Sequence, residues 1–248
     1  MALNLYQLTA TVLLNDVGIE IGLDRSADPV ASTDKGWVSL VNLLNIAVEE
    51  IAELHEWQQF KREKTFVTNT GTNPQGQYDL PTDFHYMIDQ THWDRTNSVP
   101  LGGPLSSQTW QYLKGYSVAS SSIYASFREQ EGVLMLWPTP PTAGITIAYE
   151  YASINWIRNA ADNAYIQRIV SSGDRVLLPP SVIRTYLKAK YLESKGFGSM
   201  PARESLQMFF DNQTAKNQGG GRLSLNQGSA RYPYLDPYRN APDSRYGA

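Results

Sequence analysis

The most regular hydrophobic pattern in the chain predicts a long helix near its N-terminus. Apolar residues recur there in steps of three and four: Leu40, Leu44, Ala47, Ile51 and Leu54. This spacing places them on one face of a helix, which we expect to begin after an N-cap at Asp34 and to run to about Lys64. A weaker repeat from Leu5 to Leu13 predicts a short helix that ends at Asn15.

After the long helix, the pattern becomes typical of strands. Aromatic and β-branched residues alternate with polar ones and are separated by turn sequences such as Asn73-Pro-Gln-Gly76. Three segments predict an antiparallel meander: 123–128, 133–137 and 145–157. Its last strand would turn Ile145, Ile147 and Tyr149 toward a core. A short helix capped by Ser106 or Ser107 interrupts this region.

Helical spacing returns toward the C-terminal end. Pro179 and Pro180 predict a helix start, because proline fits the first turn of a helix, and Gly196 predicts its end. We expect a further helix between Pro201 and the glycine run at 219–221. Residues 159–173 fit no single element.

The segment 219–248 differs from the rest in composition. It has four Arg, two Asp and no Lys, hence a net charge of +2, which leaves −5 on the remaining residues. Its candidate partner-binding side chains are Arg222, Arg231, Tyr232, Tyr234, Tyr238, Arg239, Arg245 and Tyr246. Tyr and Arg commonly anchor interfaces, and prolines lower the entropy lost on ordering. Two interpretations stay open: a disordered terminus, and an arm that folds onto a partner.

The overall composition argues against several classes of protein. With 21 basic and 24 acidic residues the net charge is −3, so no positive field favours sequence-specific DNA binding. The chain has no cysteine, which excludes disulfides, thiolate metal sites and a cysteine nucleophile. It also lacks a signal-peptide pattern and any apolar run of about 18 residues. We therefore expect synthesis in the cytosol and no membrane contact.

Side chains that carry catalysis are sparse. The three histidines, at 55, 85 and 92, form no zinc-binding motif. His85 and His92 lie near aspartates in the sequence, but ordinary polar loop residues explain them better than a metal site. Tyr186 and Lys190 have the spacing of a hydride-transfer pair, yet no dinucleotide-binding loop accompanies them. We predict no catalytic residue, metal or cofactor.

Two alternatives from other functional classes stay open. A cell-wall glycan hydrolase would need paired carboxylates, and the β-rich region offers Glu129, Glu131 and Glu150. A carbohydrate-binding β module would instead stack sugars on aromatic rings. Its candidates are Trp93, Trp110 and Trp137.

One flank of the long helix is acidic. It carries four glutamates: Glu49, Glu50, Glu53 and Glu56. Such a run is usually a solvated face. In a ring around DNA the same flank would repel the duplex and prevent sticking, because DNA binds proteins that neutralise its phosphates. Channel lining is therefore one hypothesis for these residues.

The middle of the chain resembles a known family. Six segments carry the likeness: Tyr78-Asp-Leu-Pro-Thr-Asp-Phe84, Trp93-Asp-Arg95, Pro100-Leu-Gly-Gly-Pro104, Gln108-Thr-Trp-Gln111, Leu136-Trp-Pro-Thr-Pro140 and Tyr149-Glu-Tyr151. Together they resemble the head-to-tail adaptors of tailed bacteriophages, which include head-completion proteins and the tail tubular protein A of short-tailed phages. The likeness is strongest from Tyr78 to Trp156.

This resemblance implies a structural role in the neck or tail of a virion assembled in the host cytoplasm. Such adaptors form rings, commonly dodecameric, that dock under the portal protein around the DNA channel. By this likeness, residues 222–248 would reach the portal. Residues 78–156 would contact neighbouring subunits or the next tail component, a nozzle or tail tube protein. DNA would pass through without sequence-specific binding.

We therefore predict an α+β fold. N- and C-terminal helices would form a bundle, with an inserted antiparallel β-rich region and an extended C-terminal arm. The expected division is a helical part at 1–66, the β-rich insert at 67–158, helices completing the bundle at 159–218, and the arm at 219–248.

Overall fold

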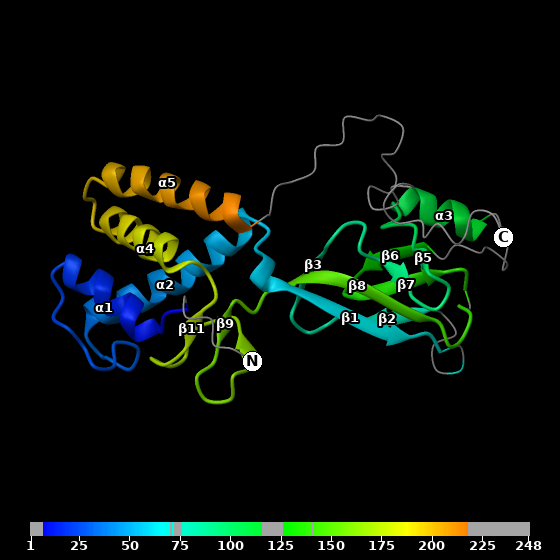
Figure 1. Cartoon of the computed structure of the whole chain (residues 1–248), viewed down its shortest axis with the longest axis horizontal. Helices are drawn as coiled ribbons and strands as arrows, with labels where there is room; N and C mark the ends of the chain where they lie inside the picture. Colours follow the sequence, from blue (N-terminus) through cyan, green and yellow to red (C-terminus); the bar gives the residue numbers. More distant parts are fainter. Residues whose placement is uncertain (1–6, 70, 72–75, 116–125, 140, 218–248) are drawn as a thin grey trace, which may run out of the picture.

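The computed structural model describes residues 7–69, 71, 76–115, 126–139 and 141–217. The fold is α+β, as predicted. Figure 1 shows an elongated molecule with most helices at one end and two antiparallel sheets at the other. The helical end is built from segments at both ends of the described chain, and the β-rich end lies between them in sequence.

Four helices form the helical body: α1 (Ala10–Glu20), α2 (Lys35–Leu54), α4 (Pro180–Ser194) and α5 (Met200–Asn217). Helix α4 packs against the other three, so the N- and C-terminal helices share one core, as expected. Leu44, Ile51, Ile183 and Leu187 are fully buried in it. A small sheet in the order β10-β9-β11 adjoins this core through Ile157. Its strands are β9 (Ile157–Arg158), β10 (Tyr165–Ile166) and β11 (Arg175–Val176).

The long helix begins as predicted but ends earlier. The Asp34 carboxylate caps it by accepting from the Gly36 N–H at 2.6 Å. It stops at Leu54 instead of about Lys64. The Trp57 indole folds back and donates to the Ile51 carbonyl at 2.9 Å, which satisfies one of the carbonyls that a helix end leaves free. The chain then passes through the short helix η1 (Gln58–Phe60) into strand β1 (Lys61–Val67).

The prediction for the first helix was wrong at both ends. Helix α1 starts at Ala10 and continues through Asn15 and Gly18. Asn15 does not break it, because its side chain is buried and exchanges two hydrogen bonds with the Ser26 backbone. Gly18 allows the Trp37 ring of α2 to pack closely against α1, since a Cβ at this position would lie 2.5 Å from the ring. Tertiary contacts thus keep two poor helix formers within the helix.

Two sheets make up the β-rich part. One has the order β1-β8-β4-β5, with β3 also paired to β8, and the other has the order β2-β7-β6. The strands after β1 are β2 (Gln77–Asp79), β3 (Phe84–Met87), β4 (Trp93–Asp94), β5 (Val99–Pro100), β6 (Ser126–Gln130), β7 (Val133–Trp137) and β8 (Thr146–Ser153). Helix α3 (Ser107–Gly115) follows β5, and the Ser106 hydroxyl accepts from the Thr109 N–H near its start.

The predicted three-stranded meander was wrong in its last strand. Strands β6 and β7 form the expected hairpin, but β8 pairs with β1, β3 and β4 in the other sheet. Strand β2 pairs with β7 on the side that β8 was expected to take. Strand β8 buries Ala148 and Ala152 as well as Ile147 and Tyr149, so both of its faces are covered and it suits the centre of a sheet.

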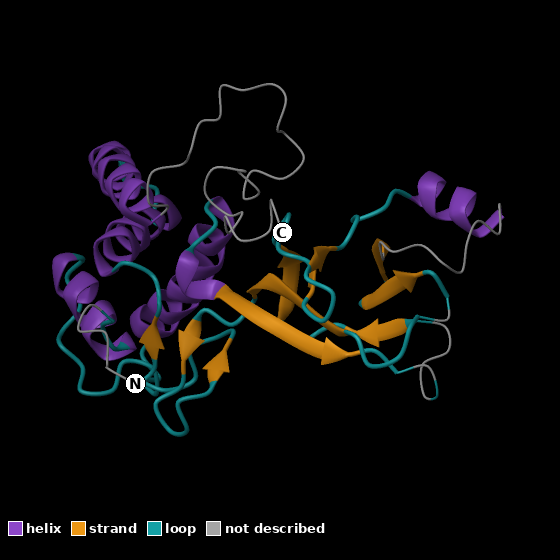
Figure 2. Cartoon of the chain, turned by 45° about the vertical axis from the view of Figure 1, so that its right-hand side comes forward, coloured by secondary structure: helices purple, strands orange, loops and turns teal. Residues whose placement is uncertain are grey.

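The two ends of the molecule have separate hydrophobic cores. One cluster of buried side chains joins the four body helices and the small sheet. The other lies between the two large sheets and centres on Phe127, Leu134 and Tyr149. The chain crosses between the two ends twice, after α2 and after β8. Figure 2 shows the long strand β1 extending away from the helices.

Candidate functional site

The polar residues considered for metal binding serve the fold of the β-rich part. His92 is buried and its ring stacks on Phe127, with 4.1 Å between the ring centroids. Burial lowers the pKa of His92 to about 4, so the ring is neutral at pH 7. The Asp94 carboxylate accepts from the backbone and side-chain nitrogens of Asn97. Within the described ranges, no three His, Asp or Glu side chains converge as a metal site would require.

The carboxylates considered for glycan hydrolysis lie on different elements. Glu129 belongs to β6 and Glu131 to the β6–β7 turn, whereas Glu150 lies on β8 in the other sheet. Burial raises the pKa of Glu129. Glu150 is exposed and stands opposite Glu63 of β1 in the strand register. Of these three, none has another as a hydrogen-bond partner.

The tryptophans considered as sugar platforms do not form a flat exposed surface. Trp110 of α3 is buried, with 3% of its surface exposed, and its ring meets Trp137 edge-on at 6.2 Å between centroids. Trp93 is half-buried in the short strand β4. Stacking on a sugar needs an accessible ring face, so Trp110 cannot serve without unpacking α3.

The acidic flank of α2 divides into two groups. Glu53 is exposed and Glu49 is half-buried. Glu56 does not lie on this flank as expected, because α2 ends at Leu54; it is exposed and lies 3.5 Å from the Lys61 ammonium. Glu50 instead faces α4, where its carboxylate accepts from the Tyr186 hydroxyl and lies 2.7 Å from the Lys190 ammonium. Burial opposes its ionisation, but the hydrogen bonds from Lys190 and Tyr186 outweigh burial and lower the pKa of Glu50. This side chain therefore joins α2 to α4 within one chain.

The same contacts argue against hydride-transfer chemistry at Tyr186. Burial, with a smaller contribution from the Glu50 carboxylate, raises the pKa of Tyr186. A tyrosine that acts as an acid–base catalyst near neutral pH needs a lowered pKa. Tyr186 and Lys190 are better explained as partners of Glu50 in the packing of α2 against α4.

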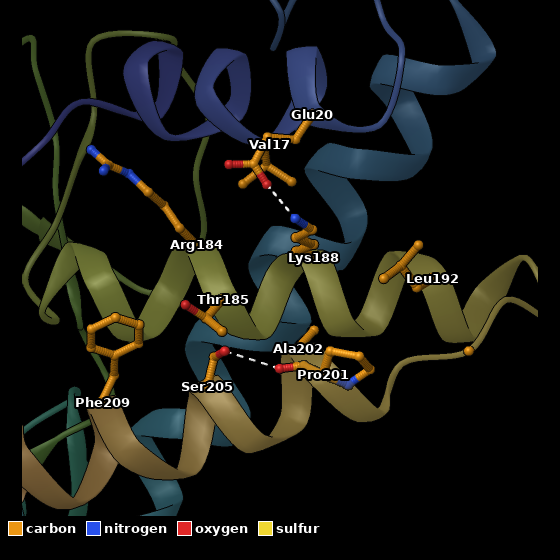
Figure 3. A pocket seen from close by; sticks show the side chains of 11 residues that line it. Val17, Glu20, Arg184, Thr185, Lys188, Leu192, Pro201, Ala202, Ser205 and Phe209 are labelled. Carbon is orange, nitrogen blue, oxygen red and sulfur yellow. Dashed lines mark hydrogen bonds and ion pairs between the residues drawn. The ribbon is translucent and has the colours of Figure 1, made fainter.

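A groove of about 380 Å³ lies between α1, α4 and α5. Figure 3 shows Val17, Leu192 and Phe209 among its lining side chains. Its two cations already have partners, since Lys188 lies 2.7 Å from Glu20 and Arg184 lies 2.8 Å from Asp16. The two hydroxyls that line the groove donate to backbone carbonyls of their own helices, Thr185 to Ser181 and Ser205 to Pro201.

A second groove, of about 670 Å³, lies between the start of α4 and the end of α5. It is lined by Leu177, Pro179 and Arg184 at the start of α4 and by Lys216 at the end of α5. Beside it, the Asn217 side chain accepts from the Gln58 N–H and donates to the Gln59 side chain, both at 2.9 Å. Sequence reasoning missed this anchor, because a contact across 158 positions leaves no local pattern.

The predicted partner-binding residues from Arg222 to Tyr246 lie outside the described residues. Asn217, at the end of α5, is the last described residue before them. No helix in the described part of the chain combines the length and apolarity needed to cross a bilayer.

Most of the chain matches a known protein family. The family model described as SU10 adaptor protein matches residues 8–222. The chain belongs to the SU10 adaptor protein family. It is thus a phage head-to-tail adaptor with a structural role in the virion, as the sequence resemblance indicated. No curated protein matches the chain in a direct comparison.

The extent of the SU10 adaptor match agrees with the architecture. It spans all four body helices and both large sheets, and it stops at 222, five residues after α5 ends at Asn217. Most of the Tyr- and Arg-bearing segment follows the matched region. The matched part therefore corresponds to the folded helices and sheets described above.

Proposed function

We propose that this SU10 adaptor forms a homo-oligomeric ring, a dodecamer, beneath the portal protein of a short-tailed phage. The ring would surround the DNA channel and join the head to the next tail component, a nozzle or tail tube protein. The family match over residues 8–222 is the single observation that carries this proposal. The body outside residues 219–248 has a net charge of −5, which disfavours binding to the DNA phosphates and so supports a channel through which DNA passes without sequence-specific binding.

In this proposal the C-terminal arm binds the portal. It is basic, carries four Tyr and four Arg, and begins beside an anchored helix end. Folding of the arm upon docking would supply the contacts, with Arg222, Arg231, Arg239 and Arg245 pairing with acidic groups and the tyrosines filling pockets. Its thirty residues could span about 100 Å if fully extended, which is ample for reaching a neighbouring ring.

The remaining surfaces take complementary roles in the proposed ring. We assign the β-rich part, residues 67–158, to neighbouring subunits or the next tail component, and the helices in 1–66 and 159–218 to the bundle. Glu49, Glu53 and Glu56 would line the channel. Glu50 would support that flank through Lys190 on α4. No step in this role requires catalysis, a metal or a cofactor.

Deletion of residues 219–248 tests the portal assignment. We expect the truncated protein to keep the circular dichroism spectrum of the full chain but to lose portal binding in a pull-down. A variant with the arm sequence scrambled at constant composition is the matched control, and it separates specific contacts from charge alone. Undiminished binding by the truncated protein would refute the role of the arm.

Electron microscopy of the protein mixed with portal tests ring formation separately. The proposal expects a ring of twelve copies stacked coaxially under the portal, in line with the closed symmetry of most homo-oligomers. Single copies bound at scattered positions on the portal would contradict it.

A further inference from the structure

The helical body and the β-rich part are joined by two short connections. Residues 55–60 lead from α2 to β1, and residues 154–156 lead from β8 to β9. Each end has its own buried core, and Trp57, Phe60 and Trp156 of the two connections belong to the core of the helical body. The angle between the two ends therefore depends on the contacts that hold the β-rich part against these buried connections and against the small sheet beside them.

Asp83, in the turn before β3, lies where β1 begins and where β8 ends. Its carboxylate accepts from the Arg62 guanidinium at 2.6 Å, at the start of β1. It also accepts from the Ser153 hydroxyl at 2.7 Å and from the Tyr151 hydroxyl at 3.0 Å, at the end of β8. The Asp83 carbonyl accepts from the Ile154 N–H at 2.9 Å. Asp83 thus adds side-chain contacts to two strands that are already paired, since Arg62 of β1 lies opposite Tyr151 of β8 in the strand register.

Arg62 extends this network to the helical end. Its guanidinium carbon lies 4.2 Å from the centroid of the Tyr165 ring, which belongs to β10 in the small sheet beside the helices. The Asp83 side chain is only 14% exposed and that of Arg62 27%. Charged groups that are withdrawn from water in this way interact more strongly than exposed pairs, because solvent screens them less.

We propose that Asp83 is a latch that fixes the angle between the helical body and the β-rich part. With its carboxylate in place, Arg62 is held against the Tyr165 ring of the small sheet and the two ends move as one body. Without it, Arg62, Tyr151 and Ser153 lose their common acceptor, and the two ends pivot about residues 55–60 and 154–156. In an adaptor this angle determines the position of the β-rich part relative to the C-terminal end of α5.

The absence of cysteine allows a direct measurement. Cysteines introduced at two exposed sites, Asn212→Cys on α5 and Ala143→Cys in the turn before β8, would carry the only spin labels on the full-length chain. Pulsed electron-spin resonance then gives the distribution of distances between the two ends. We expect one narrow distribution in the parent protein and a clearly broader one with Asp83→Ala or Asp83→Asn.

The control removes an ion pair that lies wholly within the β-rich part. Glu63 lies next to Arg62 on β1, and Glu63→Gln breaks its ion pair with Arg95, which follows β4. This change should leave the distribution unchanged. Amide exchange supplies a second readout. Loss of a charge-assisted contact worth about 1.4 kcal/mol should speed exchange at Ile154 about tenfold in Asp83→Ala, without a matching change in the β6–β7 hairpin.

A parental distance distribution in a folded Asp83→Ala protein would overturn the proposal, as would equal broadening by Glu63→Gln. If Asp83→Ala does not fold, the same distances are measured in Ser153→Ala, because this change removes one of the donors to the Asp83 carboxylate, at the end of β8. An intermediate broadening supports the latch in that variant, and the parental width refutes it.

Discussion

The neutral, buried His92 predicts that the protein loses stability as the pH falls. Its ring lies between Phe127 and Tyr149, with centroid distances of 4.1 and 5.7 Å, and its Nε2 is 3.2 Å from the sulfur of Met87. These neighbours stabilise an uncharged ring and offer no carboxylate in contact with it. We consider the change His92→Phe, which keeps an aromatic ring in the stack and removes the titration.

The magnitude follows from the two pKa values of His92. The ordinary value is 6.5, and burial lowers the pKa to about 4 in the folded chain. The folded chain requires a neutral His92 ring, so this residue makes its full contribution to the free energy of unfolding only above pH 6.5. Its contribution is lost as the pH falls through 6.5 toward 4, because only the unfolded chain takes up the proton in that range. At pH 5 the loss from His92 amounts to about 2 kcal/mol relative to pH 7.

Urea unfolding at pH 7 and pH 5 measures this contribution. Between the two pH values, the free energy of unfolding of the parent protein should fall by about 2 kcal/mol more than that of His92→Phe. The variant has its own stability cost, but that cost is the same at both pH values and cancels in the comparison. His55, whose pKa burial also lowers, titrates in both proteins and cancels likewise. Equal losses in the two proteins would show that His92 is not held neutral by its surroundings.

Two further predictions concern the helical end. Asp174 is fully buried and accepts from three backbone N–H groups of the 160–171 loop, at 2.8 to 3.0 Å, so Asp174→Ala should lower the free energy of unfolding by about 3–5 kcal/mol. Asp162→Ala, which removes one exposed hydrogen bond in the same loop, should cost less than about 1 kcal/mol, and similar losses in a thermal melt would contradict the assignment. Gly18→Ala should cost about 1–3 kcal/mol despite the higher helix propensity of alanine, because its Cβ would meet the Trp37 ring; a stabilised variant in the same melt would show that the ring can shift.

Local signals in the sequence determined the parts of the fold that depend on neighbouring residues. The apolar stripe of α2, the Asp34 cap, the proline start of α4 and the β6–β7 hairpin all follow from spacing and turn chemistry within a few positions. The succession of short motifs also pointed to the adaptor family, which the match over residues 8–222 confirms.

Contacts between distant residues decided the rest. The sequence could not show that β8 leaves the hairpin for β1, or that Glu50 turns toward Lys190. Strand β8 is apolar enough to pair on either side, and only the packing of both its faces selects its partners. Asp83 is a further example. The sequence around this turn residue does not indicate that three donors from two strands converge on its carboxylate. Hydrogen bonds and cores that close between separate segments of the chain are fixed by the whole fold, whereas caps and stripes are fixed by adjacent residues.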